Sequence, residues 1–400
     1  MLESWPYDEG DIVTEAVIVA ATRTPIGRAF KGSLTEVRPD DLAGVAISAL
    51  LAQVPQVEGS GVDDVVVGCA LTRGEAGYNL ARQAGLLAGL PDTVPGTTVN
   101  RFCASSLQTI RIAAHAIKAG ESDVIVAGGV DSSSRVPATA ADSEALNPRF
   151  VDKARSDFIN RVYIPMGITA ENVAEARGIS RERMDEYALL SHRRASAAQA
   201  DGFSAREITP VPIPDGGTMT QDDGPRPDTS LDKLAGLSPA FKEDGTVTAG
   251  NSCPLSDGAA AVLVMSSVRA AELGVAARGR VVASAVTGLA PEMMGLGPID
   301  AVRQVLSRSG LSMQDMDIVE LNEAFASQVL ACVDELGISI EDQLNPHGGA
   351  IALGHPFGMT GARIMTTLLN GLDSCDGTFG LETMCVGGGQ GMAMIVERLA

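Results

Sequence analysis

Cys103 lies at a place in the sequence that could make its sulfur a nucleophile. Apolar residues recur at helical spacing after it, so a helix is expected to begin near Ala104. The unpaired N–H groups and the dipole at the N-terminus of a helix favour a thiolate, which attacks carbonyl carbons readily. A lone cysteine is more often a buried, inert side chain, so this stretch alone leaves both interpretations open.

His355 lies in a glycine-rich stretch, NPHGGAIALGHPFGMTGAR at 345–363. Pro356 disfavours helical geometry at His355 and favours a turn, where a fixed imidazole could act as a base. A hydrogen-bonded loop histidine without a catalytic role is the simpler alternative. A zinc site is disfavoured, because the chain has only four histidines, and His347 and His355 lack the spacing of metal ligands on a helix.

Cys385 is expected to end a strand in MCVGGGQGMAMIV at 384–396. The glycines after it could direct backbone N–H groups at a negatively charged oxygen. Too few residues follow Gly391 for the helix and strand that complete a dinucleotide-binding unit. A glycine-rich turn between two core strands is the alternative.

Asn322 and Glu323 follow the predicted strand DIVEL, at the end where α/β proteins often carry their active sites. Asn322 could equally cap the N-terminus of the helix that follows.

The elements that must position these residues alternate between short apolar strands and amphipathic helices. Residues 16–21 and 62–69 are typical of buried strands, and residues 41–53 of a helix, so an α/β fold is expected. Residues 62–74 resemble residues 316–326, and a reactive residue follows each at nearly the same distance. Two similar halves would bring both residues to one central site, although chance similarity explains the spacing equally well.

The charge and the cysteine content of the chain limit its expected partners and location. With 50 acidic and 30 basic residues the formal net charge is -20, which disfavours nucleic acid and anionic membranes as partners. The six cysteines form no CxxC pair, so reduced thiols and a cytoplasmic location are expected. No membrane span and no signal peptide are predicted, and residues 1–14 are interpreted as an acidic extension. Residues 210–230 hold so many Pro and Gly that little regular structure is expected.

Together, these motifs resemble the thiolase family, as do VIVAATRTPIGRAFKGSL at 17–34, TVTAGNSCPLSDGAAAVL at 246–263 and GLGPIDAV at 295–302. The resemblance implies a duplicated, five-layered α-β-α-β-α core with an inserted loop domain. The expected division is an N-terminal half at 15–134, completed by about 255–280, a loop domain at 135–254 and a C-terminal half at 281–400.

The resemblance also implies roles for particular residues. Cys103 matches the nucleophile, His355 the base that activates it, and Cys385 the cysteine that moves a proton at the substrate α-carbon. Asn322 matches the residue that holds a water, which together with His355 stabilises the enolate oxygen. The N–H groups of Cys103 and Gly387 match the oxyanion hole of the acyl-enzyme.

Further positions match a coenzyme A and substrate site. Arg226 matches a residue that meets the nucleotide phosphates, and the remaining positions expected at this site are Met166, Phe241, Ser252, Cys253 and Phe325. Cys253 stands where the family often has serine, and Ser106 where it often has glycine.

The predicted reaction is cleavage of 3-ketoacyl-CoA by coenzyme A through an acyl-cysteine, as in fatty-acid β-oxidation, because NRFC resembles the degradative thiolases. The resemblance implies a homodimer or homotetramer, a β-oxidation partner subunit as a further option, and no metal or redox cofactor. The alternatives are a biosynthetic acetyl-CoA acetyltransferase, a non-catalytic acyl-CoA or lipid carrier, and a cysteine hydrolase using Cys103, His355 and Asn322.

Overall fold

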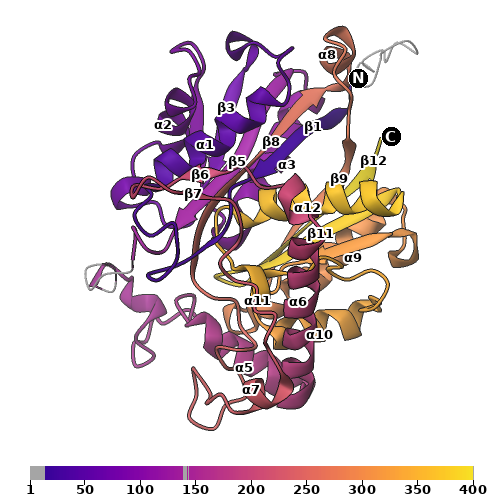
Figure 1. Cartoon of the computed structure of the whole chain (residues 1–400). Helices are drawn as coiled ribbons and strands as arrows, with labels where there is room; N and C mark the ends of the chain where they lie inside the picture. The colour runs from indigo at the N-terminus through magenta and orange to yellow at the C-terminus, as the bar shows by residue number, and fades with distance from the viewer. Residues whose placement is uncertain (1–13, 138–141, 143, 400) are drawn as a thin grey trace, which may run out of the picture.

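A computed structural model describes residues 14–137, 142 and 144–399 (Figure 1). Residues 1–13 of the expected acidic extension lie outside this range. No helix in the described part of the chain is both long and apolar enough to cross a membrane.

Two half-sheets make up the main sheet of the described chain. The first half-sheet has the order β1-β8-β5-β3-β4 and the second β9-β12-β11-β10. The halves join only where Val17 and Ile18 of β1 pair with Arg280 and Gly279 of β9. The strands are β1 (Ala16–Arg23), β3 (Asp64–Gly68), β4 (Gly96–Val99), β5 (Val124–Ser132), β8 (Ser256–Ser266), β9 (Gly279–Gly288), β10 (Ile318–Leu321), β11 (Phe379–Val386) and β12 (Gln390–Arg398); the short β2 (Gly27–Arg28) pairs with β8.

The two half-sheets repeat the same strand directions, which bears out the expected duplication. In each, an outer parallel pair (β3 with β5, β10 with β11) is followed by an antiparallel strand (β8 or β12) that pairs in turn with β1 or β9. Even β4, parallel to β3, has a counterpart in the parallel bridge of Leu344 with Val319 of β10.

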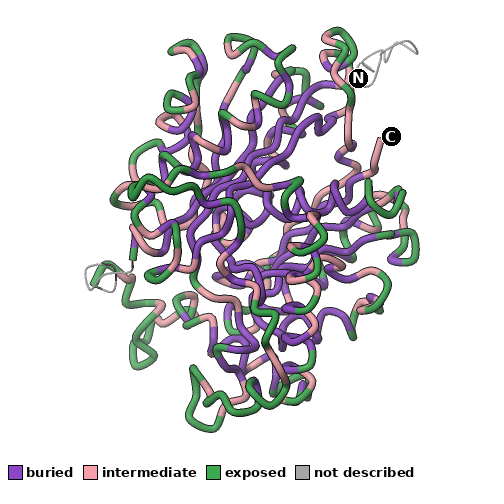
Figure 2. Tube along the Cα trace, in the orientation of Figure 1, coloured by how far each residue is buried: buried purple, intermediate pink, exposed green. Residues whose placement is uncertain are grey.

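Helices α3 (Ser105–Lys118) and α12 (Thr360–Cys375) pack against each other between the half-sheets, and α12 contacts strands of both. The outer faces are covered by α1 (Pro39–Ala52) and α2 (Leu80–Leu87) on one side and by α9 (Gly297–Ser309) and α10 (Ala326–Leu336) on the other. These are the five expected layers. Because both faces of each half-sheet are covered, most strands are buried along nearly their whole length (Figure 2), whereas β4 and β9 are only partly buried.

Residues 144–254 are mostly helix and loop. They contain α5 (Met166–Arg177), α6 (Arg181–Ala200), α7 (Leu231–Ala235) and a minimal hairpin of β6 (Val211–Pro212) and β7 (Thr218–Met219). Gly178 separates α5 from α6 in the left-handed conformation, at φ 63°. The sparse structure expected at 210–230 is confirmed. The remaining helices are α8 (Ser267–Glu272), after β8, and α11 (Ala350–Leu353), before the His355 turn.

Candidate active site

Cys103 occupies a 3-10 turn, Phe102–Ala104, immediately before α3. Phe102 has φ 44°, a conformation that L-residues seldom adopt. Two hydrogen bonds hold it there: its N–H donates to Asn100 Oδ1 at 2.8 Å, and its carbonyl accepts from Ser105 Oγ at 2.7 Å. The expected helix start is therefore correct to one residue, and the turn before it sets the direction of the Cys103 side chain.

Burial raises the pKa of the Cys103 thiol to about 11, although the N–H groups of Gly387 and of Cys103 itself donate to the sulfur and act in the opposite direction. Desolvation therefore opposes the thiolate that a helix N-terminus favours. A base is needed before this sulfur can attack.

Cys385 is the penultimate residue of β11, and a glycine turn joins β11 to β12. Gly388 and Gly389 make the turn with φ 78° and 82°, which only glycine adopts readily. Burial raises the pKa of Cys385 well above its ordinary value, and the nearby sulfurs of Cys103, Cys332 and Cys253 add to the effect. Cys103 and Cys253, which come from distant parts of the chain, therefore both lie within electrostatic range of Cys385.

His355 has a defined tautomer. Thr360 Oγ donates its only proton to the carbonyl of Pro356 at 2.8 Å, so it can only accept from His355 Nδ1, which lies 2.6 Å away. The Nε2 atom therefore carries the lone pair, directed at Nδ2 of Asn322 at 3.4 Å. Burial, helped by the charge of Arg363, lowers the pKa of His355 to about 3, so the ring is neutral.

Asn322 follows β10 and is held by its backbone, since its N–H donates to the Thr383 carbonyl of β11 at 3.0 Å. Its buried Oδ1 has no hydrogen-bond partner among the described residues. The alternative of helix capping is wrong, because the residue that precedes α10 in the N-cap position is Phe325.

The neighbouring Glu323 has a structural role, because its carboxylate is occupied by hydrogen bonds to other parts of the protein. Its carboxylate accepts hydrogen bonds from Tyr187 Oη at 2.8 Å, Ser191 Oγ at 2.6 Å and the N–H of Ile351 at 3.0 Å. These donors tie the NEAFA segment to α6 and to α11, just before the His355 turn.

Arg226 lines a pocket of about 180 Å³ together with Arg28, His192 and Lys233. Burial lowers the pKa of Arg226, and the like charge of Arg28 lowers it further. Two guanidinium groups held near each other favour an anionic ligand. Arg28 and His192 were not predicted as site residues. They lie on β2 and α6, far from Arg226 in the sequence, and reach the pocket only in the folded chain.

Ser252 and Cys253 lie differently from each other. Ser252 Oγ donates to the Thr248 carbonyl at 2.7 Å inside its own loop, so this hydroxyl is occupied by a protein contact. Cys253 lies close enough to Cys103 for the charge of the Cys103 sulfur to raise the pKa of Cys253, and the N–H of Cys253 donates to the Ala324 carbonyl at 3.1 Å.

Apolar side chains form a cluster around Cys385. It contains Phe325, which is buried, and Met166, the first residue of α5. The ring of Phe241 lies edge-on to Phe325, with 6.0 Å between the centroids, and is itself partly exposed. Met166 and Phe325 thus lie next to Cys385, and Phe241 lies against Phe325.

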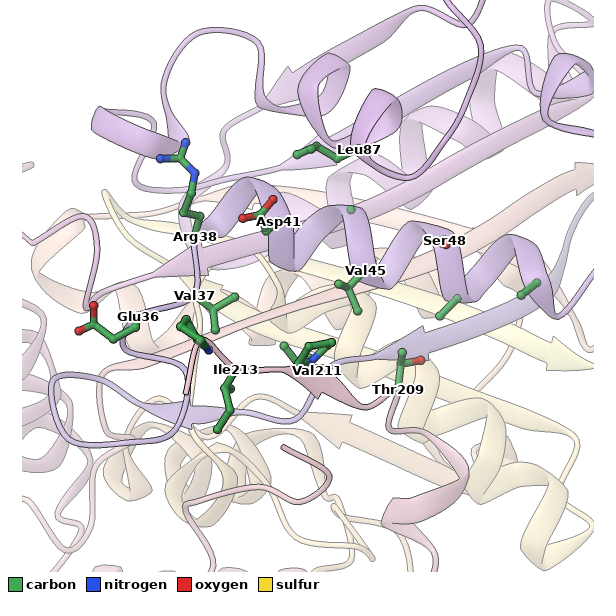
Figure 3. A pocket seen from close by; sticks show the side chains of 15 residues that line it. Glu36, Val37, Arg38, Asp41, Val45, Ser48, Leu87, Thr209, Val211 and Ile213 are labelled. Atoms are coloured by element: carbon green, nitrogen blue, oxygen red, sulfur yellow. The ribbon is translucent and has the colours of Figure 1, made fainter. Parts of the chain in front are cut away.

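A separate groove of about 820 Å³ runs along α1 and residues 209–214 (Figure 3). Val45, Val211 and Ile213 line it, and none of the predicted site residues does. In the described part of the chain, no three His, Cys, Asp or Glu side chains are grouped so that they could hold a metal ion.

Comparison with known proteins identifies the family of the chain. Residues 16–268 match the thiolase N-terminal domain and residues 275–398 the thiolase C-terminal domain. The chain is 46% identical to the beta-ketoadipyl-CoA thiolase of Acinetobacter baylyi, over 96% of this chain and 99% of that protein. It is 45% identical to the 3-ketoacyl-CoA thiolase of Bacillus subtilis, with the same coverage.

Solved structures agree as well. The Bacillus anthracis acetyl-CoA acetyltransferase superposes with a TM-score of 0.88 at 39% identity, over 97% of this chain and 99% of that one. Human mitochondrial 3-ketoacyl-CoA thiolase superposes with a TM-score of 0.89 at 37% identity, over 98% and 100%. Full-length matches to both domains, on a duplicated fold that brings three thiols together, have one explanation: the chain belongs to the thiolase family of acyltransferases.

Proposed function

We propose that this enzyme cleaves 3-ketoacyl-CoA with coenzyme A, giving acetyl-CoA and an acyl-CoA two carbons shorter. The observation that supports this most strongly is the proximity of two thiols from distant parts of the chain: Cys385 lies within electrostatic range of Cys103, whose sulfur accepts the N–H of Gly387. One thiol can take up the acyl group while the other remains available to protonate carbon, and a hydrolase has no use for the second.

In the first half-reaction, His355 Nε2 accepts the proton of Cys103 as the sulfur attacks the 3-keto carbon. The resulting oxyanion would be stabilised by the N–H groups of Cys103 and Gly387, which in the free protein both donate to the sulfur. Collapse of the adduct breaks the bond between carbons 2 and 3 and leaves the acyl group on Cys103.

The electron pair of that bond passes to the enolate of acetyl-CoA. Its oxygen would be stabilised by the proton now on His355 and by a water bound to Asn322, whose Oδ1 has no partner among the described residues. Cys385 donates a proton to the enolate carbon, and acetyl-CoA leaves. Coenzyme A then attacks the acyl-cysteine, its thiol proton restores Cys385, and the proton on His355 returns to Cys103 as the acyl-CoA departs.

The pocket at Arg28 and Arg226 is the proposed site for the phosphates of coenzyme A, and Met166, Phe241 and Phe325 for the acyl side of the site. Coenzyme A acts as a substrate, and none of these steps requires a metal or redox cofactor. We further propose that the enzyme acts in β-oxidation in the cytoplasm. It would do so as a homodimer or homotetramer, with or without a partner subunit.

The reverse condensation of two acetyl-CoA molecules is the second candidate, because a solved neighbour at 39% identity is named an acetyl-CoA acetyltransferase. Both reactions use the same residues. Initial rates across acetoacetyl-CoA, longer 3-ketoacyl-CoA thioesters and 3-oxoadipyl-CoA separate them: activity confined to acetoacetyl-CoA would favour the acetyltransferase.

Cys103→Ala tests the proposed function. Mixing wild-type enzyme with a 3-ketoacyl-CoA, without free coenzyme A, should add one acyl group to the peptide that carries Cys103, as measured by mass spectrometry. The variant should lose this adduct and lower kcat by more than about 10³-fold. Cys375→Ala, which removes an exposed thiol, is the matched control. Full thiolysis by Cys103→Ala would refute the proposal.

A further inference from the structure

Asp131 is fully buried near the C-terminal end of β5, and its carboxylate accepts hydrogen bonds from four donors. Oδ1 accepts from the N–H of Leu71 at 3.0 Å and from Cys69 Sγ at 3.4 Å. Oδ2 accepts from the N–H of Ala70 at 3.0 Å and from the N–H of Gly358. With two donors on each oxygen, only the ionised carboxylate satisfies all four.

These donors belong to two loops that carry the reacting groups. Gly358 lies in the turn between His355 and α12. The loop at 69–71 leads to Cys103 through Asn100, whose Nδ2 donates to the Ala70 carbonyl at 3.1 Å and whose Oδ1 accepts from the N–H of Phe102 at 2.8 Å. Asp131 is therefore the point at which the nucleophile turn and the base turn are joined.

The backbone around Gly358 leaves little room for other arrangements. A Cβ on Gly129 would stand 1.9 Å from the Gly358 carbonyl oxygen, and a Cβ on Gly358 would stand 2.5 Å from the Val130 carbonyl oxygen. The His355 turn thus lies directly on the backbone of β5. Gly358 is buried, and its N–H donates to the Asp131 carboxylate.

We propose that Asp131 is a positioning residue that holds Cys103 and His355 in register by binding both of their loops with one carboxylate. The proposal rests on the proposed function for the roles of those two residues. Asp131 does not work by activating the thiol through its charge, because that charge raises the pKa of Cys103. Its contribution is geometric, and a misplacement of catalytic groups by a fraction of an ångström is enough to slow catalysis.

Burial raises the pKa of Asp131 to about 6, while the four hydrogen bonds oppose the rise. The titratable groups that face it are the thiols of Cys69 and Cys103, and burial raises the pKa of both. As the pH falls through about 6, the Asp131 carboxylate takes up a proton. One of its oxygens then becomes a hydrogen-bond donor and faces N–H groups that are also donors. The pKa of His355 is about 3, so the imidazole does not titrate in this range.

The test compares Asp131→Asn with Asp63→Asn. Asp63 also accepts two backbone N–H bonds, from Asp123 and Val124, but at the opposite end of β3 and β5. Asp131→Asn should lower kcat about 10- to 100-fold with KM changed less than about twofold, the range typical of a supporting hydrogen-bond partner. Wild type and Asp63→Asn should lose kcat below pH 6, and Asp131→Asn should be low and flat from pH 5 to 7.

Asn100→Ala covers the case in which Asp131→Asn does not fold, because Asn100 is exposed. It should lower kcat about tenfold with an unchanged thermal midpoint, within the same range. Normal kcat in Asn100→Ala, or in a folded Asp131→Asn, would overturn the proposal. The rate of Cys103 alkylation by iodoacetamide, compared between wild type and Asn100→Ala, reports the same positioning without turnover, because this substitution changes no charge. If wild type shows no thiolysis, the proposed function fails, while the alkylation rates still test Asp131.

Discussion

Glu320 and Glu382 are paired residues on the neighbouring parallel strands β10 and β11, and both side chains are fully buried. Both carboxylate oxygens of Glu382 lack a hydrogen-bond partner among the described residues. Burial raises the pKa of Glu320 to about 8 and that of Glu382 well above its ordinary value, although the charge of Arg363 of α12 lowers both. Burial thus favours the protonated form of both carboxyl groups.

A raised pKa makes stability depend on pH. A carboxyl group whose pKa is raised on folding stabilises the fold fully below its unfolded pKa, and this stability is lost as the pH rises through the folded pKa of about 8. Glu382→Gln removes one of the two groups. Between pH 6 and 8.5 the variant should lose less free energy of unfolding than wild type, by about 1 kcal/mol or more. Guanidinium denaturation at both pH values measures this, with the exposed Glu341→Gln as control; equal losses in all three proteins would contradict it.

Cys385→Ala separates acylation from carbon protonation. Cys103 and its Gly387 contact remain, so acyl transfer to Cys103 from a simple acyl-CoA should survive within about tenfold, whereas exchange of the α-proton of acetyl-CoA into D₂O should fall below detection. NMR follows the exchange, and mass spectrometry follows the acyl-enzyme. Normal exchange in Cys385→Ala would remove this residue from the proton-transfer role.

Thr360→Val tests the tautomer of His355. Without the hydroxyl, Nδ1 loses the acceptor that lies 2.6 Å away, and the lone pair is no longer confined to Nε2. We expect kcat to fall about 10- to 100-fold. Thr360→Ser keeps the hydroxyl and should retain most activity, so equal losses in the two variants would show that the methyl group, not the hydrogen bond, is needed.

Alkylation of the free enzyme reports the protonation state of Cys103. Because burial raises its pKa to about 11, the thiolate fraction should grow about tenfold per pH unit between pH 7 and 10, and with it the rate of iodoacetamide labelling. A Cys103–His355 ion pair, the opposite case, would give a rate independent of pH above 7. Cys375, which is exposed, provides an internal comparison in the same digest.

Much of the fold follows from local patterns. The apolar runs at 16–21 and 62–69 form β1 and β3, and the residues with helical spacing after Cys103 form α3. In each case the pattern of apolar residues matches the face or faces that the element buries. The division at residues 134, 254 and 281 remains a prediction, since no comparison tests those boundaries.

The site was only partly predictable. Its sulfurs and imidazole belong to recognisable motifs, whereas Thr360 and Asp131 act through contacts that exist only after folding. The Cys103 thiolate was inferred from helix geometry alone, and the sequence gives no measure of the desolvation that opposes it. Ser106, where the family often has glycine, has a structural reason: its Oγ accepts from the N–H of Ala362 in the first turn of α12, at 2.9 Å.

The central layer of the sandwich, α3 from one half and α12 from the other, has a consequence for assembly. α12 contacts β1, β5 and β8 of the first half as well as α3, so a polypeptide comprising a single half would expose this contact surface to water. Such a fragment would bury this surface only by associating with another half. Two separately expressed halves should therefore be insoluble or molten when apart and become ordered when mixed.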